Sequence, residues 1–205
     1  MKVAAAFVVG LGVFSASASY GEIVYSGPIG DSATSSSGPV TVEIAGNEYQ
    51  FAIVSGGPVF FAGITANNDG AGLFVTVSNL GNARNFNAGN TIGTLTEVLD
   101  MYPIGSGGGA NLFAIMHDYA SGAGNFSPDG TGYVGFGFGG PINFNYGWMR
   151  FTLSNPDVPA LRTVTIVDWA YESNLNQSIE VGAIPAPGAI AVAALAGLAS
   201  RRRRR

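Results

Sequence analysis

The stretch VTVEIAGNEYQFAI, residues 40–53, decides the fold. Val40, Val42 and Ile44 alternate with polar residues, and after Gly46-Asn47 the alternation resumes through Phe51 and its neighbours. Such a period of two places the apolar side chains on one face of a strand, and a Gly/Asn pair between two alternating runs marks a tight turn. The stretch therefore predicts a β-hairpin with one buried face.

The same pattern recurs along the chain, separated by Gly/Asn/Asp clusters that are typical of turns. Further strands are predicted at Glu22–Tyr25, Val59–Ile64, Leu73–Ser78, Thr94–Leu99, Leu112–Met116, Gly132–Phe138, Asn143–Leu153, Val164–Trp169 and Ile179–Val181. No stretch between the two termini shows a sustained 3.6-residue apolar period. About ten short strands without such a helix predict an all-β domain, an antiparallel β-sandwich of jelly-roll-like topology.

The first 18 residues have the order of a secretory signal peptide. Lys2 is followed by an uncharged apolar run from Val3 to Phe14, and Ala16 and Ala18 supply the small residues of a cleavage site. This order of regions is recognised by signal peptidase. Export with cleavage after Ala18 is expected, which makes 1–18 a removable segment.

The last 21 residues, 185–205, have a different membrane-directed order. Pro185-Ala186-Pro187 interrupts the backbone, residues 188–199 are uncharged and largely apolar, and a basic cluster follows. That cluster is Arg201, Arg202, Arg203, Arg204 and Arg205. As a helix the apolar run measures about 18 Å, against a hydrocarbon core of about 30 Å, so it is a short transmembrane helix that spans only with snorkelling and bilayer thinning. The arginines favour the cytoplasmic side, which places the preceding domain outside.

This arrangement resembles the PEP-CTERM sorting signal, in which a Pro-Glu-Pro-type motif precedes an apolar helix and a basic cluster. Ala186 stands where that family has its central Glu. The resemblance implies processing by an exosortase-like membrane protease after transient anchoring. A nucleic-acid patch, a disordered tail, an expression artefact or a buried helix are the alternative interpretations of the tail. The signal peptide at the other end weighs against them, because both signals place the same middle segment outside.

The middle segment, 19–184, is one acidic domain. It holds all thirteen acidic residues and only three basic ones, Arg84, Arg150 and Arg162, for a net charge of −10 where the whole chain has −4. Nucleic-acid binding needs clustered Lys and Arg, so no nucleic-acid partner is expected. Cysteine is absent, which excludes disulfides, thiolate metal sites and thiol nucleophiles. The domain is expected to fold on its core alone.

Residues that carry chemistry form no recognisable catalytic set. The chain's one histidine, His117, lies next to Asp118, but adjacent residues of a strand point to opposite faces, so Asp118 is badly placed to orient it. Asp168 and Glu172 are the carboxylates nearest to aromatic residues. Their spacing in the sequence does not define the distance between two carboxylates that a glycosidase requires. We expect Asp168 to bind backbone at the sheet edge and Glu172 to be solvated. No enzymatic activity is predicted.

Cofactors are not expected either, with calcium as the one alternative. Asn67-Asn68-Asp69-Gly70 and Asp129-Gly130 combine oxygen donors with a glycine, as calcium loops do. Neither completes the alternating acidic pattern with a distal Glu, and a simple turn explains each. No metal ligand is therefore assigned.

An aromatic-rich segment, 133–182, resembles a block that recurs in PEP-CTERM-bearing exported proteins. It contains Trp148, Trp169 and Tyr171. Core or sheet-edge packing is the simpler interpretation of the two tryptophans, and a ligand-stacking surface is the alternative.

Together these features predict an exported protein of the cell envelope, cell surface or extracellular matrix, transiently anchored in the membrane, with a non-enzymatic structural role. Its expected partners are the signal peptidase, an exosortase-like protease and extracellular polysaccharide. The alternative function is an extracellular carbohydrate-binding or adhesive module that uses Trp148, Trp169 and Tyr171.

Overall fold

The hairpin predicted at residues 40–53 is formed by β3 (Val40–Ile44) and β4 (Asn47–Gly56). Its two-residue turn is Ala45-Gly46, one position earlier than the Gly46-Asn47 pair that the sequence suggested, and Ile44 pairs with Asn47. Ala45 and Gly46 have φ values of 50° and 77°. Two positive φ angles are what a type I′ turn requires, and this turn matches the right-handed twist of the flanking strands.

The structure is a computed structural model that describes residues 22–56, 59–66, 71–76, 79–93, 101–102, 114–140 and 143–185. These residues form fifteen strands and one short 3-10 helix, η1 (Pro159–Leu161), and no α-helix is found among them. The remaining strands are β1 (Ile23–Tyr25), β2 (Ser32–Thr34), β5 (Val59–Ala66), β6 (Ala71–Thr76), β7 (Asn79–Ala83), β8 (Asn85–Phe86), β9 (Thr91–Ile92), β10 (Met101–Tyr102), β11 (Ala114–Asp118), β12 (Thr131–Gly140), β13 (Asn143–Ser154), β14 (Thr163–Glu172) and β15 (Ile179–Glu180). The prediction of an all-β fold is confirmed.

One large sheet contains nearly all of these strands, in the order β1-β14-β13-β12-β6-β7-β11-β5-β4-β3. β2 is a second partner of β14, on the strand that also pairs with β1. β9 pairs with β15 in a separate two-stranded sheet. All but one of the pairings are antiparallel. The expectation of a purely antiparallel sheet is wrong at one place, because β11 runs parallel to β7, with Ile115 opposite Asn82. A parallel pair needs a long crossover connection, which residues 84–113 supply.

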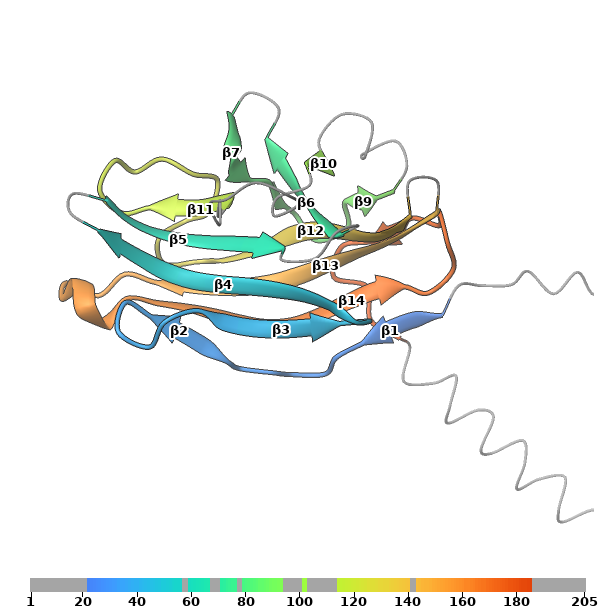
Figure 1. Cartoon of the computed structure of the whole chain (residues 1–205), viewed down its shortest axis with the longest axis horizontal. Coiled ribbons are helices and arrows are strands. Elements are labelled where there is room, and N and C mark those ends of the chain that lie inside the picture. The colour runs from blue at the N-terminus through green and yellow to red at the C-terminus, as the bar shows by residue number, and fades with distance from the viewer. Residues whose placement is uncertain are drawn as a thin grey trace, which may run out of the picture.

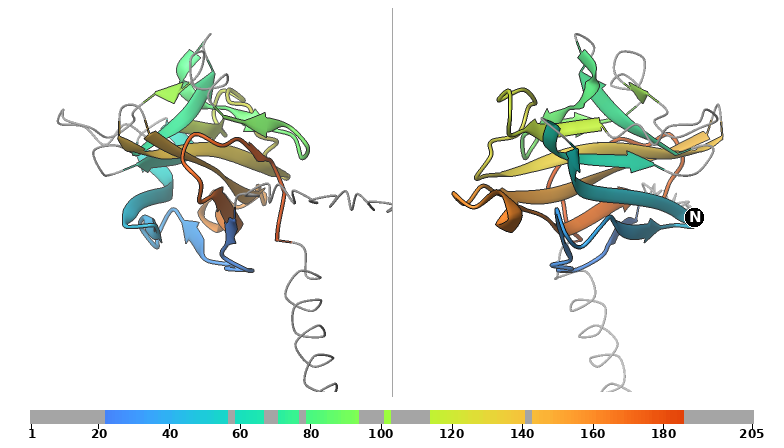
Figure 2. Two further views of the ribbon diagram at one scale, coloured as in Figure 1. Left: turned by 90° about the vertical axis from the view of Figure 1, so that its right-hand side faces the viewer. Right: turned by 60° about the vertical axis from the view of Figure 1, so that its left-hand side comes forward.

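The sheet folds back on itself, so that its two ends face each other. Figures 1 and 2 show β3, β4 and β5 lying across β12, β13 and β14. Rings meet between the two halves: Tyr49 of β4 lies 5.2 Å from Phe136 of β12, and Phe51 of β4 lies 5.3 Å from Phe151 of β13, measured between ring centroids. The main hydrophobic core is the space between them, filled by the alternate apolar residues of both halves.

A second, smaller core lies on the opposite, outer face of β13 and β14. Tyr146 and Trp148 of β13 and Ala170 of β14 are buried there beneath Phe86, Ile92, Ile179 and Val181, which come from β8, β9 and the segment of β15. The outer face is therefore covered at one end. At its other end, no strand among the described residues lies over it.

An extra residue in β14 changes which face each side chain of this strand occupies. Arg150 of β13 pairs with Asp168, but Phe151 pairs with Ile166, so Val167 has no partner on β13. Such a bulge re-aims the side chains that follow it. Before the bulge Val164 and Ile166 face the main core, and after it Trp169 and Tyr171 do so, while Asp168 and Ala170 lie on the outer face.

Most predicted strands are confirmed with shifts at their ends. β6 begins and ends two residues before the predicted Leu73–Ser78, and β11 begins and ends two residues after the predicted Leu112–Met116. β14 ends at Glu172, three residues beyond the predicted Trp169. The predicted strand at Thr94–Leu99 lies outside the described residues. Strands β2, β7, β8, β9 and β10 were not predicted.

Both membrane-directed segments lie outside the described residues, apart from Pro185. Within the residues that the structure describes, no helix has the length and apolar character that a membrane crossing requires.

Candidate functional site

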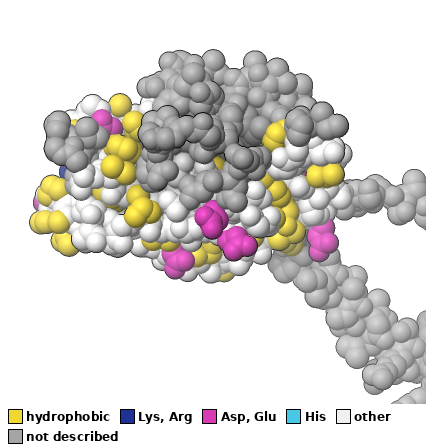
Figure 3. Space-filling view, viewed as in Figure 1, with side chains coloured by type: hydrophobic (Ala, Val, Ile, Leu, Met, Phe, Trp, Pro, Cys, Tyr) yellow, Lys and Arg dark blue, Asp and Glu magenta, His cyan; other side chains and the backbone are white. Residues whose placement is uncertain are grey.

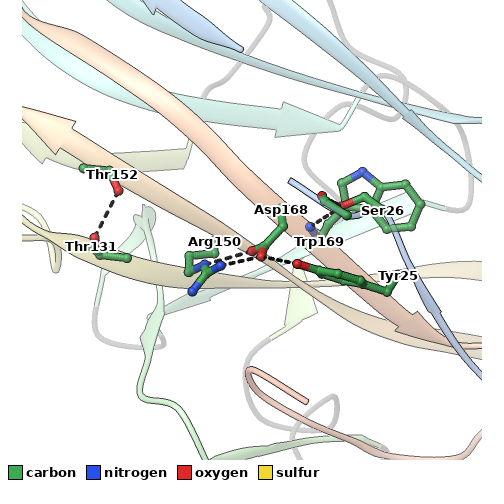
Figure 4. Close-up of polar contacts among 8 residues, drawn as sticks. Tyr25, Ser26, Thr131, Arg150, Thr152, Asp168 and Trp169 are labelled. Atoms are coloured by element: carbon green, nitrogen blue, oxygen red, sulfur yellow. Dashed lines mark hydrogen bonds and ion pairs between the residues drawn. The ribbon is translucent and has the colours of Figure 1, made fainter. Parts of the chain in front are cut away.

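A charged pair and a phenol form the polar centre of the outer face. Arg150 donates from Nε to Oδ1 of Asp168 at 2.8 Å and from Nη2 to Oδ2, and the hydroxyl of Tyr25 donates to Oδ2 at 2.8 Å. Figure 4 shows the three side chains converging from β13, β14 and β1. The bulge at Val167 makes this possible, because it places Asp168 on the same face as Arg150.

The carboxylate of this group is buried, whereas the guanidinium reaches solvent. The side chain of Asp168 is 2% exposed and that of Arg150 is 34% exposed. Burial opposes the charge of Arg150, but the hydrogen bond and the charge of Asp168 outweigh it and raise the pKa of Arg150 above its usual value. The hydrogen bond to Asp168, followed by burial, raises the pKa of Tyr25. A planar two-bond contact of this kind fixes the relative position of the strands as well as the charge.

Two further aromatic residues flank the pair. Tyr133 of β12 lies opposite Arg150 in the strand register, and its ring contacts Trp148 edge-on at 5.5 Å. Tyr25 lies on the other side of Trp148, at 6.5 Å between ring centroids. Trp148 is 1% exposed, and its Nε1 has no hydrogen-bond partner among the described residues. The stacking role suggested for Trp148 is therefore wrong, because its ring is covered on both sides by the protein.

The other two aromatic residues suggested for ligand stacking are only half-buried. Trp169 and Tyr171 are two residues apart on β14, with ring centroids 6.0 Å apart and an interplanar angle of 22°. Phe138 of β12 contacts Tyr171 edge-on at 5.1 Å, which holds one end of this pair. Ser26 supports the other end through its Oγ, which accepts a hydrogen bond from the backbone N–H of Trp169. Trp169 and Tyr171 thus form a supported pair of nearly parallel rings at the margin of the main core.

His117 is a buried residue of β11. Its side chain is 8% exposed, its ring contacts Tyr119 edge-on at 4.9 Å, and its Nδ1 has no partner in the part of the chain that the structure describes. Asp118 instead accepts hydrogen bonds from Ser121 and the backbone N–H of Ala120, and these bonds lower its pKa. The expectation that Asp118 does not orient His117 is confirmed.

The roles expected for Asp168 and Glu172 are wrong. Asp168 binds Arg150 and Tyr25 rather than backbone, and it lies on a strand that is paired on both sides. Glu172 is 6% exposed rather than solvated, and its Oε1 accepts from the backbone N–H of Asn174 at 2.9 Å. Both carboxylates follow the bulge, which the alternation of the sequence does not reveal.

The two turns considered for calcium have different outcomes. At Asp129-Gly130 the carboxylate Oδ1 of Asp129 accepts from the backbone N–H of Asn155 at 2.6 Å, so this side chain fastens one turn to another. The stretch 67–70 lies outside the described residues. In the described ranges no group of three or more His, Cys, Asp or Glu residues is placed to hold a metal ion.

Of the residues assigned to sorting and cleavage, only Pro185 is described, and it is exposed at the end of the described chain. Ala16, Ala18, Ala186, Pro187 and Arg201, Arg202, Arg203, Arg204 and Arg205 lie outside the described residues.

Sequence reasoning did not identify the contact of Arg150 with Asp168 and Tyr25. One signal was present, because Arg150 is one of three basic residues in the domain and lies inside an apolar strand, where a charge needs a partner. No protein-family model matches this chain, and neither a curated protein nor a solved structure matches it.

Proposed function

We propose that this chain is an exported protein of the cell surface or extracellular matrix with a non-enzymatic, structural role. The observation that carries the proposal is the order of the tail, in which Pro185-Ala186-Pro187, an uncharged run and five arginines follow one another. The N-terminal order of Lys2, an apolar run and Ala16-Ser17-Ala18 supports it independently. The acidic, cysteine-free domain lies between these two signals.

The proposed path has three steps. Signal peptidase cleaves after Ala18, the C-terminal helix holds the chain in the membrane with its arginines inside, and an exosortase-like protease then acts near Pro185. Access to that position supports the last step, because Ile184 is 51% exposed and Pro185 is exposed where the folded domain ends.

We further propose that the domain is an antiparallel β-sandwich of jelly-roll-like type, apart from the parallel pair of β7 and β11. The packing of β3, β4 and β5 against β12, β13 and β14 across one core supports this assignment. A sandwich without disulfides suits a surface protein whose stability comes from a large aromatic core.

Mass spectrometry of the native protein recovered from the producing cells tests the proposed path. The expected mature chain begins near Ser19 and ends near Pro185 to Pro187. A chain that retains Met1 and Arg205 and remains inside the cells would contradict it.

A second function, carbohydrate binding, is favoured by one observation, the half-buried and nearly parallel rings of Trp169 and Tyr171. Aromatic faces of this kind pack against the C–H faces of sugars. Binding to immobilised glycans that is lost in Trp169→Ala but kept in the matched variant Trp148→Phe would support it. Equal binding by Trp169→Ala and the parent would exclude this surface.

A further inference from the structure

Three cross-strand pairs of hydroxyl residues line the open end of the outer face. Thr131 pairs with Thr152 at 3.0 Å, Ser32 with Thr165 at 2.7 Å and Ser154 with Thr163 at 2.7 Å, measured between hydroxyl oxygens. They come from β12, β13, β14 and β2. The register places Thr131, Thr152, Thr165 and Ser32 in one row across the four strands, with Ser154, Thr163 and Thr34 in the row beside it.

These two rows, called the hydroxyl face below, are regular in both directions. Neighbouring strands are about 4.8 Å apart, and side chains on one face recur about every 6.7 Å along a strand. The hydroxyl groups therefore repeat at regular intervals on this face of the twisted sheet. Thr131 and Ser32 are exposed and the others are partly exposed.

Each pair keeps hydrogen-bonding capacity for a ligand. A hydroxyl has one proton and two lone pairs, so the Thr131–Thr152 and Ser154–Thr163 bonds each leave one proton and several lone pairs unused. Ser32 also donates to the carbonyl oxygen of Gly30 at 3.5 Å, so its pair with Thr165 offers lone pairs only. Threonine also presents a methyl group beside its oxygen. A surface of alternating hydroxyl and methyl groups is complementary to a sugar chain, which presents hydroxyls and C–H groups in the same way.

The Arg150–Asp168 pair borders the hydroxyl face without giving it a net charge. Figure 4 shows Thr152 on the same strand as Arg150 and Thr131 on the neighbouring strand, with Asp168 and Tyr25 beyond Arg150. Arg150, whose side chain is 34% exposed, points its charge at a buried carboxylate. Such a planar group offers further N–H donors at the margin of the face.

The charge of the domain selects the kind of partner. The exposed side of the β3–β4 hairpin carries Glu43 directly opposite Glu48, and acidic side chains gather there in the space-filling view of Figure 3. The rows of hydroxyls contain no charged residue. With a net charge of −10 the domain repels an anionic polymer, whereas a neutral polymer meets no such barrier at the hydroxyl face.

We infer that the hydroxyl face binds a neutral polysaccharide, with the sugar hydroxyls bonded to the Thr and Ser rows and to the margin formed by Arg150. This inference rests on the proposed extracellular function and names the substrate class of its surface. It differs from the carbohydrate alternative above, because it uses the outer face of the sheet and not the rings of Trp169 and Tyr171.

The test removes hydroxyls without changing shape. The full-length chain, kept in mild detergent, is compared with a triple variant, Thr131→Val, Thr152→Val and Thr165→Val, for retention on immobilised cellulose, dextran and mannan, with alginate as the anionic comparator. Valine matches threonine in shape and strand propensity, so the variant should fold. Binding to at least one neutral polymer should weaken about tenfold or more, because several hydrogen bonds are lost together.

Two controls separate the hydroxyl groups from other effects. The triple Ser variant at the same positions keeps the hydroxyls and loses only the methyl contacts, so it should bind more tightly than the triple Val variant, and Thr41→Val on the exposed side of β3 should change nothing. The inference is overturned if the parent is retained on none of the neutral polymers, if it prefers alginate, or if the triple Val variant binds like the parent. If the triple Val variant does not fold, the single variant Thr152→Val takes its place and should bind the neutral polymer at least threefold more weakly than the parent. Equal binding by Thr152→Val and the parent would also overturn the inference.

Failure of the proposed function has a different signature. Cell fractionation reports export, and these threonines are remote from both sorting segments in the sequence. Intracellular protein that still binds neutral polysaccharide would contradict the proposed location and not the surface. Exported protein whose binding depends on Trp169 alone would contradict the surface and not the location.

Discussion

Arg150 and Asp168 lie opposite each other on β13 and β14 because β14 contains one residue more than its partner at this point. If β14 had no bulge at Val167, its side chains would alternate regularly from Val164 onwards, and Asp168 would face the main core beside Ile166. The bulge therefore brings a buried carboxylate and a half-exposed guanidinium to one face. It also turns Trp169 and Tyr171 toward the margin of the main core.

Asp168→Asn should destabilise the domain. The substitution keeps the size of the side chain but leaves Arg150 without its anion and weakens the acceptor of the Tyr25 hydroxyl. Removing one partner of a largely buried charged pair costs on the order of 2–3 kcal/mol in the free energy of unfolding. Urea denaturation followed by circular dichroism measures it.

The matched control for this variant is Asp157→Asn, which removes an exposed carboxylate from the β13–β14 connection. Surface changes of this kind stay within about 0.5 kcal/mol. Equal midpoints for Asp168→Asn and Asp157→Asn would show that the Arg150 contact contributes nothing to stability.

Gly147→Ala should destabilise the domain through overpacking. A Cβ at this position of β13 would overlap the ring of Phe136 and lie 2.6 Å from the carbonyl oxygen of Ala170. One side is backbone and the other is a buried ring, so neither yields without moving the core. A loss of about 1–3 kcal/mol is expected in the same urea experiment.

Gly140→Ala provides the comparison within the neighbouring strand. No atom lies within 4 Å of a Cβ built on Gly140, so this variant should unfold at the parent's midpoint or slightly above it. A Gly147→Ala variant as stable as Gly140→Ala would mean that Phe136 is packed less tightly than described.

Tyr49→Phe should stabilise the domain at neutral pH. Tyr49 is fully buried, and its hydroxyl has no hydrogen-bond partner among the described residues. An unsatisfied buried hydroxyl carries a desolvation cost, so its removal should add about 1 kcal/mol to the free energy of unfolding. A loss of stability instead would indicate that the hydroxyl has a partner in the folded protein.

The pH dependence of the same variant follows from burial. Burial raises the pKa of Tyr49, so the folded state keeps this proton above about pH 10, where an unfolded tyrosine releases it. The unfolded state then binds fewer protons, and stability falls as the pH rises. Between pH 8 and about pH 11 the parent should lose about 1.4 kcal/mol more than Tyr49→Phe.

Tyr119 contributes to the same alkaline loss, since burial raises its pKa to about 12. Tyr119→Phe should therefore also reduce the loss of stability at alkaline pH. The double variant of Tyr49→Phe and Tyr119→Phe should reduce this loss further. Parallel pH curves for the parent and Tyr49→Phe would contradict the burial of the Tyr49 hydroxyl.

The sequence was most informative where strands are long and one face is buried. The stretch 40–53 predicted β3 and β4 because alternation and turn chemistry agree there, and β12, β13 and β14 followed from the same pattern. β2, with Ser32 and Thr34, was missed because a three-residue polar segment carries no periodicity. It is a strand only because β14 offers it an edge.

The candidate site was less predictable than the fold. A bulge is set by the pairing of two strands and not by the residues of one, so the alternation of Val164, Ile166 and Asp168 does not reveal that the carboxylate lies on the outer face. Trp148 is likewise buried in a cluster that includes Ile179 and Val181, which are distant from it in the sequence. Contacts between residues distant in sequence cannot be read from local patterns.

The proposed location depends on the basic cluster of Arg201, Arg202, Arg203, Arg204 and Arg205. Replacing all five by Ser removes the cations that snorkel to the cytoplasmic surface and fix the orientation of a short helix. The protein should then be misrouted or released unprocessed, as judged by cell fractionation and by mass spectrometry of its C-terminus. Its melting temperature should stay within about 1 °C of the parent's, because the buried core residues that the structure describes all come before residue 182. Replacing Arg84 and Arg162 by Ser should leave the routing unchanged. This result would show that sorting depends on the position of the arginines and not on the total charge of the chain. Normal processing of the five-serine variant would mean that the tail is not a sorting signal, and the surface location would then depend on the N-terminal segment alone.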